Sequence, residues 1–183
     1  MEIAVSRSKI SGQVEIPGSK SHTIRAIVLA SLAKGASTIK APLVSEDTVS
    51  CLQAASTLGA WIKRGDDTIW RISGTGGKLL QPAGVIDMGN SGTGLRLFTS
   101  IAARADFPIS FDGDESLRTR TMASLLAALQ AMGAKVESAN GKCPLSVTGP
   151  INGAEVTIEG KTSQYLSSLL FAAPLLENDT VIH

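Results

Sequence analysis

Two kinds of helix alternate in the pattern of apolar and polar residues along the chain. Apolar and small residues occupy nearly every position of 22–33, 93–104 and 164–176, which predicts helices buried on every side. Two other segments carry a single apolar stripe at helical spacing, formed by Val49, Leu52, Ala55 and Leu58 in one and by Met122, Leu125, Leu126, Leu129 and Met132 in the other. Gly59 and Gly133 follow the stripes, where C-terminal caps are expected.

The same order of elements occurs more than once. A short β-type run follows each apolar helix, at 37–40, 108–111 and 179–182, and a predicted hairpin follows each striped helix. The two hairpins end in Gly74 and Gly149. The chain is therefore built from a unit of helix, strand, helix and hairpin that recurs about every 72 residues.

The repeat predicts an α/β fold that is neither Rossmann-like nor a TIM barrel. Complete units span 17–89 and 90–160, and a partial third unit spans 161–183. The three buried helices should cluster centrally, with mixed sheets and the striped helices outside. Residues 1–16 contain two strand-like runs, Glu2–Val5 and Gln13–Ile16, which precede the first unit and could serve another domain.

Composition narrows the classes of protein that this chain can represent. It has 183 residues, 43% of them hydrophobic and only 4% aromatic, so the expected core is aliphatic. The net charge of +1 gives no electrostatic reason to bind nucleic acid or an acidic membrane surface. Neither a membrane-spanning run nor a signal peptide is recognisable, and Cys51 and Cys143 are too far apart for a metal motif. We expect a cytoplasmic protein with two free thiols.

Candidate chemistry is concentrated at the starts of the three apolar helices. These open with Ser19-Lys20-Ser21, Ser91-Gly92-Thr93 and Thr162-Ser163-Gln164. A helix N-terminus offers unpaired N–H groups and a positive dipole end, and Lys20 and Arg25 add full positive charges. Three such starts side by side would form a site for a small anionic ligand.

Further residues near these helix starts fit an anion site. Gly92 allows a ligand to approach the backbone, Asn90 can cap or hold a loop, Arg120 adds charge, and Gln164 can donate or accept a hydrogen bond. Ser and Thr at helix starts are also ordinary caps, so each feature alone has a structural explanation. The loop at Gly89–Gly94 lacks the Lys-Ser/Thr of a nucleotide-binding P-loop.

Taken together, these motifs resemble one enzyme family. The segments are Pro17–Ala26, Glu46-Asp47-Thr48, Gly89–Thr93, Arg118–Arg120 and Thr162–Leu166. From about Ile10 onward the chain resembles the N-terminal part of 5-enolpyruvylshikimate-3-phosphate (EPSP) synthase, also called 3-phosphoshikimate 1-carboxyvinyltransferase. The resemblance implies transfer of enolpyruvyl from phosphoenolpyruvate to the 5-hydroxyl of shikimate 3-phosphate with release of phosphate, in the shikimate pathway to aromatic amino acids.

The resemblance also implies an architecture and a set of site residues. Family members have two similar domains, each with three βαβαββ units around buried parallel helices, bind substrates between the domains, and need no metal or organic cofactor. The residues implied for shikimate 3-phosphate are Lys20, Ser21, Arg25, Thr162, Ser163 and Gln164. Those implied for phosphoenolpyruvate are Lys20, Asn90, Gly92, Thr93, Arg120 and Gln164, with Asp47 nearby. Lys20 has the catalytic role of stabilising developing charge.

Glyphosate competes with phosphoenolpyruvate in this family and is implied as a possible inhibitor here. A methyl group at Gly92 would intrude on it. Two residues depart from the best-known sensitive members, which have Ala in place of Ser91 and Pro in place of Leu97. Sensitivity to glyphosate is therefore left open.

The end of the chain at His183 leads to a further expectation. In the family, the second domain supplies the carboxylates for proton transfer and further cations, so we expect this chain alone not to turn over and to need a complementing C-terminal domain. A non-catalytic anion-binding module is the alternative from another class. The sister transferase acting on UDP-N-acetylglucosamine fits less well, because it has Asn after the lysine and a Cys in the loop corresponding to Asp112–Thr119, whereas this chain has Ser21 and no Cys there.

Overall fold

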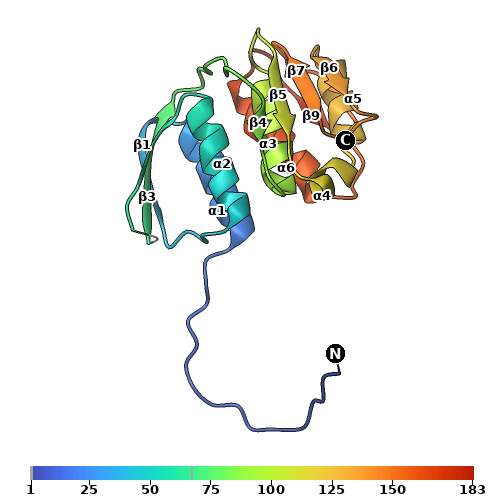
Figure 1. The fold of residues 1–183 in the computed structure, drawn as a ribbon. Coiled ribbons are helices and arrows are strands. Elements are labelled where there is room, and N and C mark those ends of the chain that lie inside the picture. The colour runs from blue at the N-terminus through green and yellow to red at the C-terminus, as the bar shows by residue number, and fades with distance from the viewer. Residues whose placement is uncertain (1, 67) are drawn as a thin grey trace.

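A computed structural model describes residues 2–66 and 68–183 (Figure 1). Its helices are α1 (Lys20–Leu32), α2 (Glu46–Thr57), α3 (Gly92–Ala102), α4 (Glu115–Thr119), α5 (Ala123–Ala131), α6 (Ser163–Ala172) and the short 3-10 helix η1 (Ala173–Leu175). Its strands are β1 (Lys34–Lys40), β2 (Trp61–Arg64), β3 (Ile69–Thr75), β4 (Ile86–Asp87), β5 (Ile109–Asp112), β6 (Lys135–Ser138), β7 (Leu145–Thr148), β8 (Glu155–Val156) and β9 (Val181–Ile182). The predicted order of helix, strand, helix and hairpin is present twice, with α4 as an addition in the second unit.

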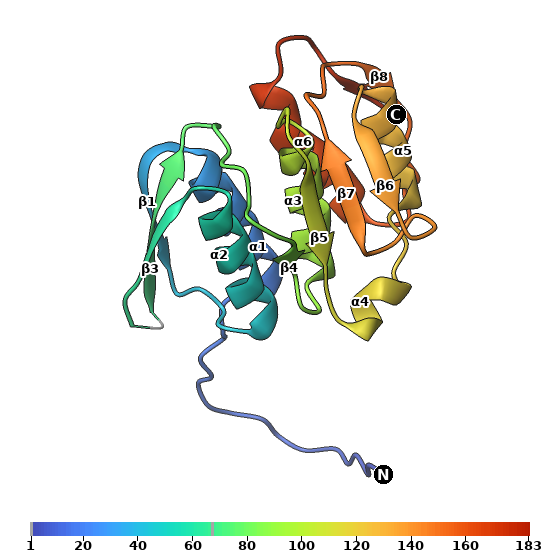
Figure 2. The ribbon, with the colours of Figure 1, turned by 45° about the horizontal axis from the view of Figure 1, so that its top comes forward.

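The strands form three small sheets, and the last strand of each complete unit, β4 or β8, pairs in the sheet of the following unit. The first has the order β1-β3-β2 and is antiparallel throughout. The second has the order β4-β5-β7-β6 and is mixed, because β4 pairs with β5 in parallel while the other pairs are antiparallel. The third is the parallel pair β8-β9. Figure 2 shows the first two sheets on opposite sides of the central helices. The α/β class predicted from the sequence is confirmed, and mixed pairing is confined to the second sheet.

Helix α3 is the centre of the molecule, packing against α1 and α2 on one side and α6 on the other. Nine of its eleven residues are buried, including Leu95, Phe98 and Ile101. The prediction that all three apolar helices are buried on every side is wrong for the other two. Leu29 of α1 is 53% exposed, and Leu166 and Leu170 of α6 are 42% and 51% exposed. Helix α1 also packs against α2 and β3, and only part of its surface, including Leu29, faces outward, whereas α6 packs mainly against α3 and leaves Leu166 and Leu170 outside.

The predicted helix at 164–176 is also shorter than expected. The α-helix ends at Ala172 and continues as η1, where Pro174 cannot donate a backbone hydrogen bond. The caps of the striped helices agree with the sequence. Ser45 caps α2 in a reciprocal capping box with Thr48, and Gly59 and Gly133 follow α2 and α5 with φ of 111° and 105°.

Gly74 and Gly149 explain why each hairpin ends in glycine. A Cβ on Gly74 would lie 2.3 Å from the carbonyl oxygens of both Ala30 and Ala33, at the C-terminal end of α1. A Cβ on Gly149 would lie 1.8 Å from the carbonyl oxygen of Ala103, the C-cap residue of α3. In both units the end of the hairpin therefore crosses the end of the apolar helix at backbone contact. The sequence repeat is thus also a repeat of packing.

The strands predicted at Glu2–Val5 and Gln13–Ile16 are not formed. Residues 2–18 extend away from the folded part (Figure 1), and Ile3, Val5 and Ile16 are between 74% and 92% exposed. A strand requires a partner for its backbone N–H and C=O groups. No other part of the described chain pairs with this segment.

No helix in the described residues is long and apolar enough to cross a membrane.

Candidate functional site

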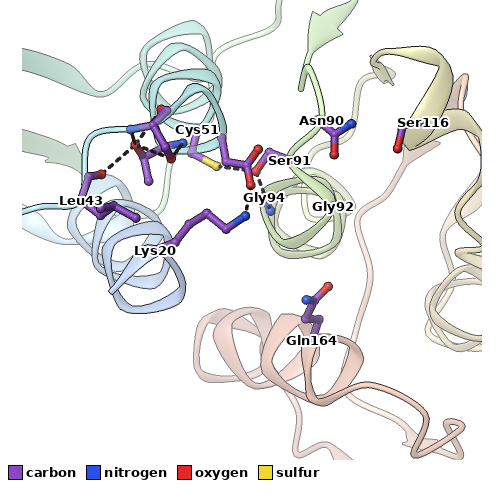
Figure 3. Close-up of polar contacts among 12 residues, drawn as sticks. Lys20, Leu43, Cys51, Asn90, Ser91, Gly92, Gly94, Ser116 and Gln164 are labelled. Carbon is purple, nitrogen blue, oxygen red and sulfur yellow. Dashed lines mark hydrogen bonds and ion pairs between the residues drawn. The ribbon is translucent and has the colours of Figure 1, made fainter. Parts of the chain in front are cut away.

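The N-terminal ends of α1, α3 and α6 face one space, which we call the three-helix mouth. Figure 3 shows Lys20, Gly92 and Gln164, one from the start of each helix, around it. The predicted caps are all confirmed: Ser19 accepts from the backbone N–H of His22 (3.4 Å), Ser91 from Gly94 (3.3 Å) and Thr162 from Gln164 (3.2 Å). Each cap satisfies one of the first N–H groups of its helix. The positive ends of three helix dipoles therefore converge here.

Lys20 is the first residue of α1 and reaches toward α2. Its ammonium forms an ion pair with Asp47, with Nζ and Oδ2 2.5 Å apart. The capping box that begins α2 at Ser45 places Asp47 in the first turn of that helix. The Lys20 side chain is 50% exposed and the Asp47 side chain 18%. Lys20 is thus held beside the mouth while its ammonium stays accessible to a ligand.

Arg25 lies one turn further along α1 and connects two of the helices. Its guanidinium donates to the backbone oxygen of Ser21 (3.2 Å) and to Oγ of Ser167 on α6 (3.1 Å). Ser21 itself is exposed in the first turn of α1. Lys20, Ser21 and Arg25, which the family resemblance assigned to one ligand, therefore lie in the first two turns of α1, with Lys20 directed to α2 and Arg25 to α6.

Asn90 and Arg120 form the wall beside α3. The Asn90 side-chain amide donates to Oδ2 of Asp114 (2.7 Å), and its oxygen accepts a bond from Nη2 of Arg120. Arg120 also donates to the backbone oxygen of Asn90 (3.4 Å) and to Oγ of Ser116 (3.3 Å). Both polar atoms of the Asn90 amide are thus bound within the protein. In this arrangement Asn90 orients Arg120 toward the start of α3.

Gly92 lies against two guanidinium groups, which a side chain there would displace. A Cβ there would lie 2.8 Å from Nη1 of Arg120 and 2.9 Å from Nη1 of Arg96. The absence of a side chain lets two guanidinium groups approach the start of α3. Gly92 and Arg120 were predicted from the sequence, but Arg96 was not. Arg96 is the charged residue of α3 and lies one turn after Gly92 on the same helix face. That position is a signal from which it could have been predicted.

The remaining predicted residues also lie at the helix starts. Thr93 is half-buried in the first turn of α3, and Ser163 is exposed as the first residue of α6. Gln164 is half-buried and extends toward α3 (Figure 3). Its oxygen accepts a hydrogen bond from Nη1 of Arg96 (2.7 Å). All residues singled out from the sequence therefore lie on the elements that bound the three-helix mouth.

The cysteines are structural in this arrangement. Both are free and buried, and burial raises the pKa of Cys51 to about 12 and that of Cys143 to about 11. Neither forms the thiolate that a nucleophile needs at neutral pH. Sγ of Cys51 lies 3.4 Å from Oγ of Ser91 and so supports the cap of α3. Within residues 2–66 and 68–183, no cluster of three or more His, Cys, Asp or Glu residues could hold a metal ion.

Two aspartates hold the loop that carries Arg120. The guanidinium of Arg118 keeps the pKa of Asp112 below its usual value, chiefly through a side-chain hydrogen bond. The pKa of Asp114 is lowered mainly by the backbone N–H of Leu117 and then by the Asn90 amide. These bonds are strongest when both aspartates are ionised, so they stabilise the charged carboxylates.

We expect the stability of this loop to fall in acid. A lowered folded-state pKa stabilises the fold above the unfolded pKa of aspartate, about 3.9, and this contribution is lost as the pH falls through the folded-state pKa. Melting temperatures measured from pH 6 down to pH 2.5, a range of about 3.5 units chosen to bracket that transition, should fall more steeply for the wild type than for Asp114→Asn. If the melting temperatures of the two proteins fell in parallel, Asp114 would not contribute to the loss of stability in acid.

Comparison with known proteins identifies what this arrangement is similar to. The family model described as EPSP synthase (3-phosphoshikimate 1-carboxyvinyltransferase) matches residues 5–183. A protein from Methanocorpusculum labreanum named 3-phosphoshikimate 1-carboxyvinyltransferase is 49% identical over the whole of this chain, which covers 44% of that protein. One of the same name from Acetivibrio thermocellus is 45% identical over the whole chain, covering 43% of that protein. The chain thus spans less than half the length of these relatives.

The fold has a counterpart among solved structures. The 2.37 Å structure of EPSP synthase from Acinetobacter baumannii matches 93% of this chain with a TM-score of 0.87 and 31% sequence identity. The match covers 40% of that protein. The sequence and structure comparisons therefore agree on the family and on the extent of the match.

Proposed function

This chain belongs to the EPSP synthase (3-phosphoshikimate 1-carboxyvinyltransferase) family, and from that premise we propose that it forms the shikimate 3-phosphate half of the enzyme's active site. In the complete reaction, enolpyruvyl passes from phosphoenolpyruvate to the 5-hydroxyl of shikimate 3-phosphate and phosphate is released. Both substrates are phosphorylated anions. Both would bind at the three-helix mouth, where a second domain would complete the site.

The observation that carries this proposal is the convergence of three capped helix starts with Lys20, Arg25 and Arg120 around them. Shikimate 3-phosphate would bind to Lys20, Ser21 and Arg25 from α1 and to Thr162, Ser163 and Gln164 from α6. Phosphoenolpyruvate would bind near Gly92, with Lys20, Arg120 and Gln164 supplying donors and with Asn90 and Thr93 shaping the loop. Such fixed donors bind phosphate and carboxylate without reorganisation.

Lys20 and Arg120 would stabilise charge during the reaction. Protonation of the methylene carbon of phosphoenolpyruvate and addition of the 5-hydroxyl, which gives up its proton, at the central carbon form a tetrahedral adduct. The adduct then loses phosphate and a proton from its methyl group, which restores the carbon–carbon double bond. Lys20 would stabilise the charge of this adduct from the start of α1, and Arg120 from the side of α3. Glyphosate, as an anion that competes for the phosphoenolpyruvate position in this family, would meet the same groups.

Proton transfer calls for a carboxylate that is available to substrate. Near the mouth, Asp47 is paired with Lys20, and Asp114 caps α4 and accepts from Asn90. These contacts support a mechanism in which the acid–base groups come from a second domain, which would close over the ligands and exclude water. The unpaired apolar residues of 2–16 fit the same proposal, because this segment would find strand partners in that domain.

The proposed function predicts binding without turnover. Calorimetric titration of the 183-residue chain with shikimate 3-phosphate should show one site, and an assay of phosphate release with both substrates should show none. Adding a separately produced C-terminal part of the Methanocorpusculum labreanum relative should restore release if the two parts dock. Release by the chain alone would show that the acid–base groups are within it.

The three helix starts that face one space would also suit one competing interpretation, a module that binds anions without catalysis. Binding and complementation experiments distinguish this module from the enzyme. Such a module would bind inorganic phosphate about as well as shikimate 3-phosphate and would give no phosphate release with any added domain. Preference for shikimate 3-phosphate, which also offers hydroxyl groups to Ser21 and Gln164, would support the enzyme.

A further inference from the structure

Arg96 occupies an unusual place in the central helix. All residues of α3 are described, and Arg96 is the only charged one among them. Its guanidinium donates to the backbone oxygen of Gly92 (3.0 Å), to Oε1 of Gln164 on α6 (2.7 Å) and to the backbone oxygen of Thr121 (3.3 Å). The group lies over the ring of Tyr165, 5.5 Å from its centre. Arg96 therefore joins the starts of two of the three helices.

The chemistry of guanidinium determines how Gln164 is oriented. Arginine has five N–H donors and no acceptor, so the Gln164 atom that faces it must be the amide oxygen. The amide nitrogen is then directed away from Arg96. Figure 3 shows Gln164 pointing from α6 toward the start of α3, with its nitrogen on the side of Lys20. Gln164 thus presents N–H groups to the mouth.

The same guanidinium also occupies a second acceptor. The backbone oxygen of Gly92, in the first turn of α3, accepts from Nη1 of Arg96, which holds the guanidinium beside that helix start. Arg120 likewise donates to the backbone oxygen of Asn90 and to its side-chain oxygen. The amide oxygens of Gln164 and Asn90 are therefore both bound by arginines.

We propose that Arg96 is a positioning residue that fixes the Gln164 amide with its N–H groups toward the ligand, so that the mouth selects ligands whose facing oxygens are fully ionised acceptors. The inference about the ligand rests on the proposed function, whereas the orientation of Gln164 does not. Without Arg96, the amide could turn and present its oxygen, which would oppose the binding of an anion.

A double-mutant cycle in ligand binding tests this role. The 183-residue chain and its variants Arg96→Met, Gln164→Met and the double variant are titrated with shikimate 3-phosphate by calorimetry. Each single change should weaken binding about fivefold to tenfold, the effect of one ordinary hydrogen bond. The double variant should bind within about twofold of the weaker single variant, because both changes remove the same donor. The proposal would be overturned if the losses of affinity in the two single variants multiplied in the double variant. It would also be overturned if Arg96→Met bound shikimate 3-phosphate as tightly as the wild type.

A second cycle tests the orientation without any ligand. With Arg96 present, Gln164→Glu places a carboxylate oxygen where the amide oxygen was, and the pair gains a charge-assisted bond. The change in melting temperature caused by Gln164→Glu should therefore be more favourable by about 2–4 °C in the Arg96 protein than in the Arg96→Met background. Equal changes in both backgrounds would show that Arg96 does not face this atom, and would overturn the proposal.

Tyr165→Phe is the matched control for a merely structural role. The Tyr165 hydroxyl donates to the backbone oxygen of Thr121 (2.8 Å), the same oxygen that accepts from Nη2 of Arg96. This variant should lower the melting temperature and leave the affinity for shikimate 3-phosphate unchanged. If Tyr165→Phe lost as much affinity as Arg96→Met, the effect would come from damage to the junction at Thr121 and not from the orientation of Gln164.

The two cycles separate this inference from the proposed function. If the wild-type chain binds neither shikimate 3-phosphate nor inorganic phosphate, the function of the mouth is refuted together with the selection of anions. The melting-temperature cycle still decides whether Arg96 orients Gln164. If the wild type binds and the cycles show no coupling, the function stands and the role of Arg96 is refuted.

Discussion

Lys20→Met should weaken the binding of shikimate 3-phosphate and of phosphoenolpyruvate about 30-fold to 100-fold, equivalent to ~2–3 kcal/mol. Lys20 supplies a full positive charge at the start of α1, and it also neutralises Asp47, whose Oδ2 lies 2.5 Å from its Nζ. Removing the ammonium takes one charge-assisted bond from the ligand and leaves an unpaired carboxylate beside the mouth. Calorimetric titration of the two proteins measures the difference.

The role of Asp47 provides an internal check of this explanation. Adding Asp47→Asn to the Lys20→Met variant removes the unpaired negative charge, so the double variant should recover part of the lost affinity. Lys34→Met is the control for net charge. Lys34 follows the C-terminal end of α1, and the thirteen residues of that helix separate it from the mouth by roughly 20 Å. Equal losses for the Lys34 and Lys20 variants would indicate a general effect of charge and no specific site.

Gly74→Ala should destabilise the fold by about 3 kcal/mol or more, which exceeds the usual cost of overpacking because the obstructing atoms are backbone. Its Cβ would lie 2.3 Å from the carbonyl oxygens of Ala30 and Ala33, and 2.9 Å from the backbone nitrogen of Ala33. The end of β3 would have to move away from α1. That movement would also break the bond from the backbone N–H of Gly76 to the oxygen of Ala33 (3.0 Å).

Chemical denaturation of matched glycine variants tests this prediction. Gly84→Ala is the control, because its Cβ would meet nothing within 4 Å and its φ is not positive. Gly149→Ala should behave like Gly74→Ala, since its Cβ would lie 1.8 Å from the oxygen of Ala103. A Gly74 variant as stable as the Gly84 variant would show that β3 and α1 are not in backbone contact.

Local patterns predicted much of the architecture from the sequence alone. The apolar periodicity located the helices, Ser19, Ser91 and Thr162 marked three of their starts, and Gly59 and Gly133 marked two ends. Each of these signals acts within one or two helical turns, where backbone conformation and hydrogen bonding depend on neighbouring residues. The repeat then implied that the three starts would lie together.

The prediction of solvent exposure was less successful because burial depends on distant elements. Nothing in the composition of α1 or α6 distinguishes Leu29 or Leu170, which are exposed, from Leu95 in the central helix, which is buried. The strands predicted in residues 2–16 met the same limit. Their alternating apolar residues indicate strands, but a strand forms only where a partner edge is present.

The sequence by itself determined most of the helices, the repeat, the family and most of the residues that surround the mouth. Only the tertiary structure decided which polar groups bind one another, because those partners come from different elements: Lys20 with Asp47, Asn90 with Arg120, and Arg96 with Gln164, which is 68 residues away. These pairings determine the direction of each hydrogen bond. They orient the polar groups around the three-helix mouth, a property that no local pattern in the sequence contains.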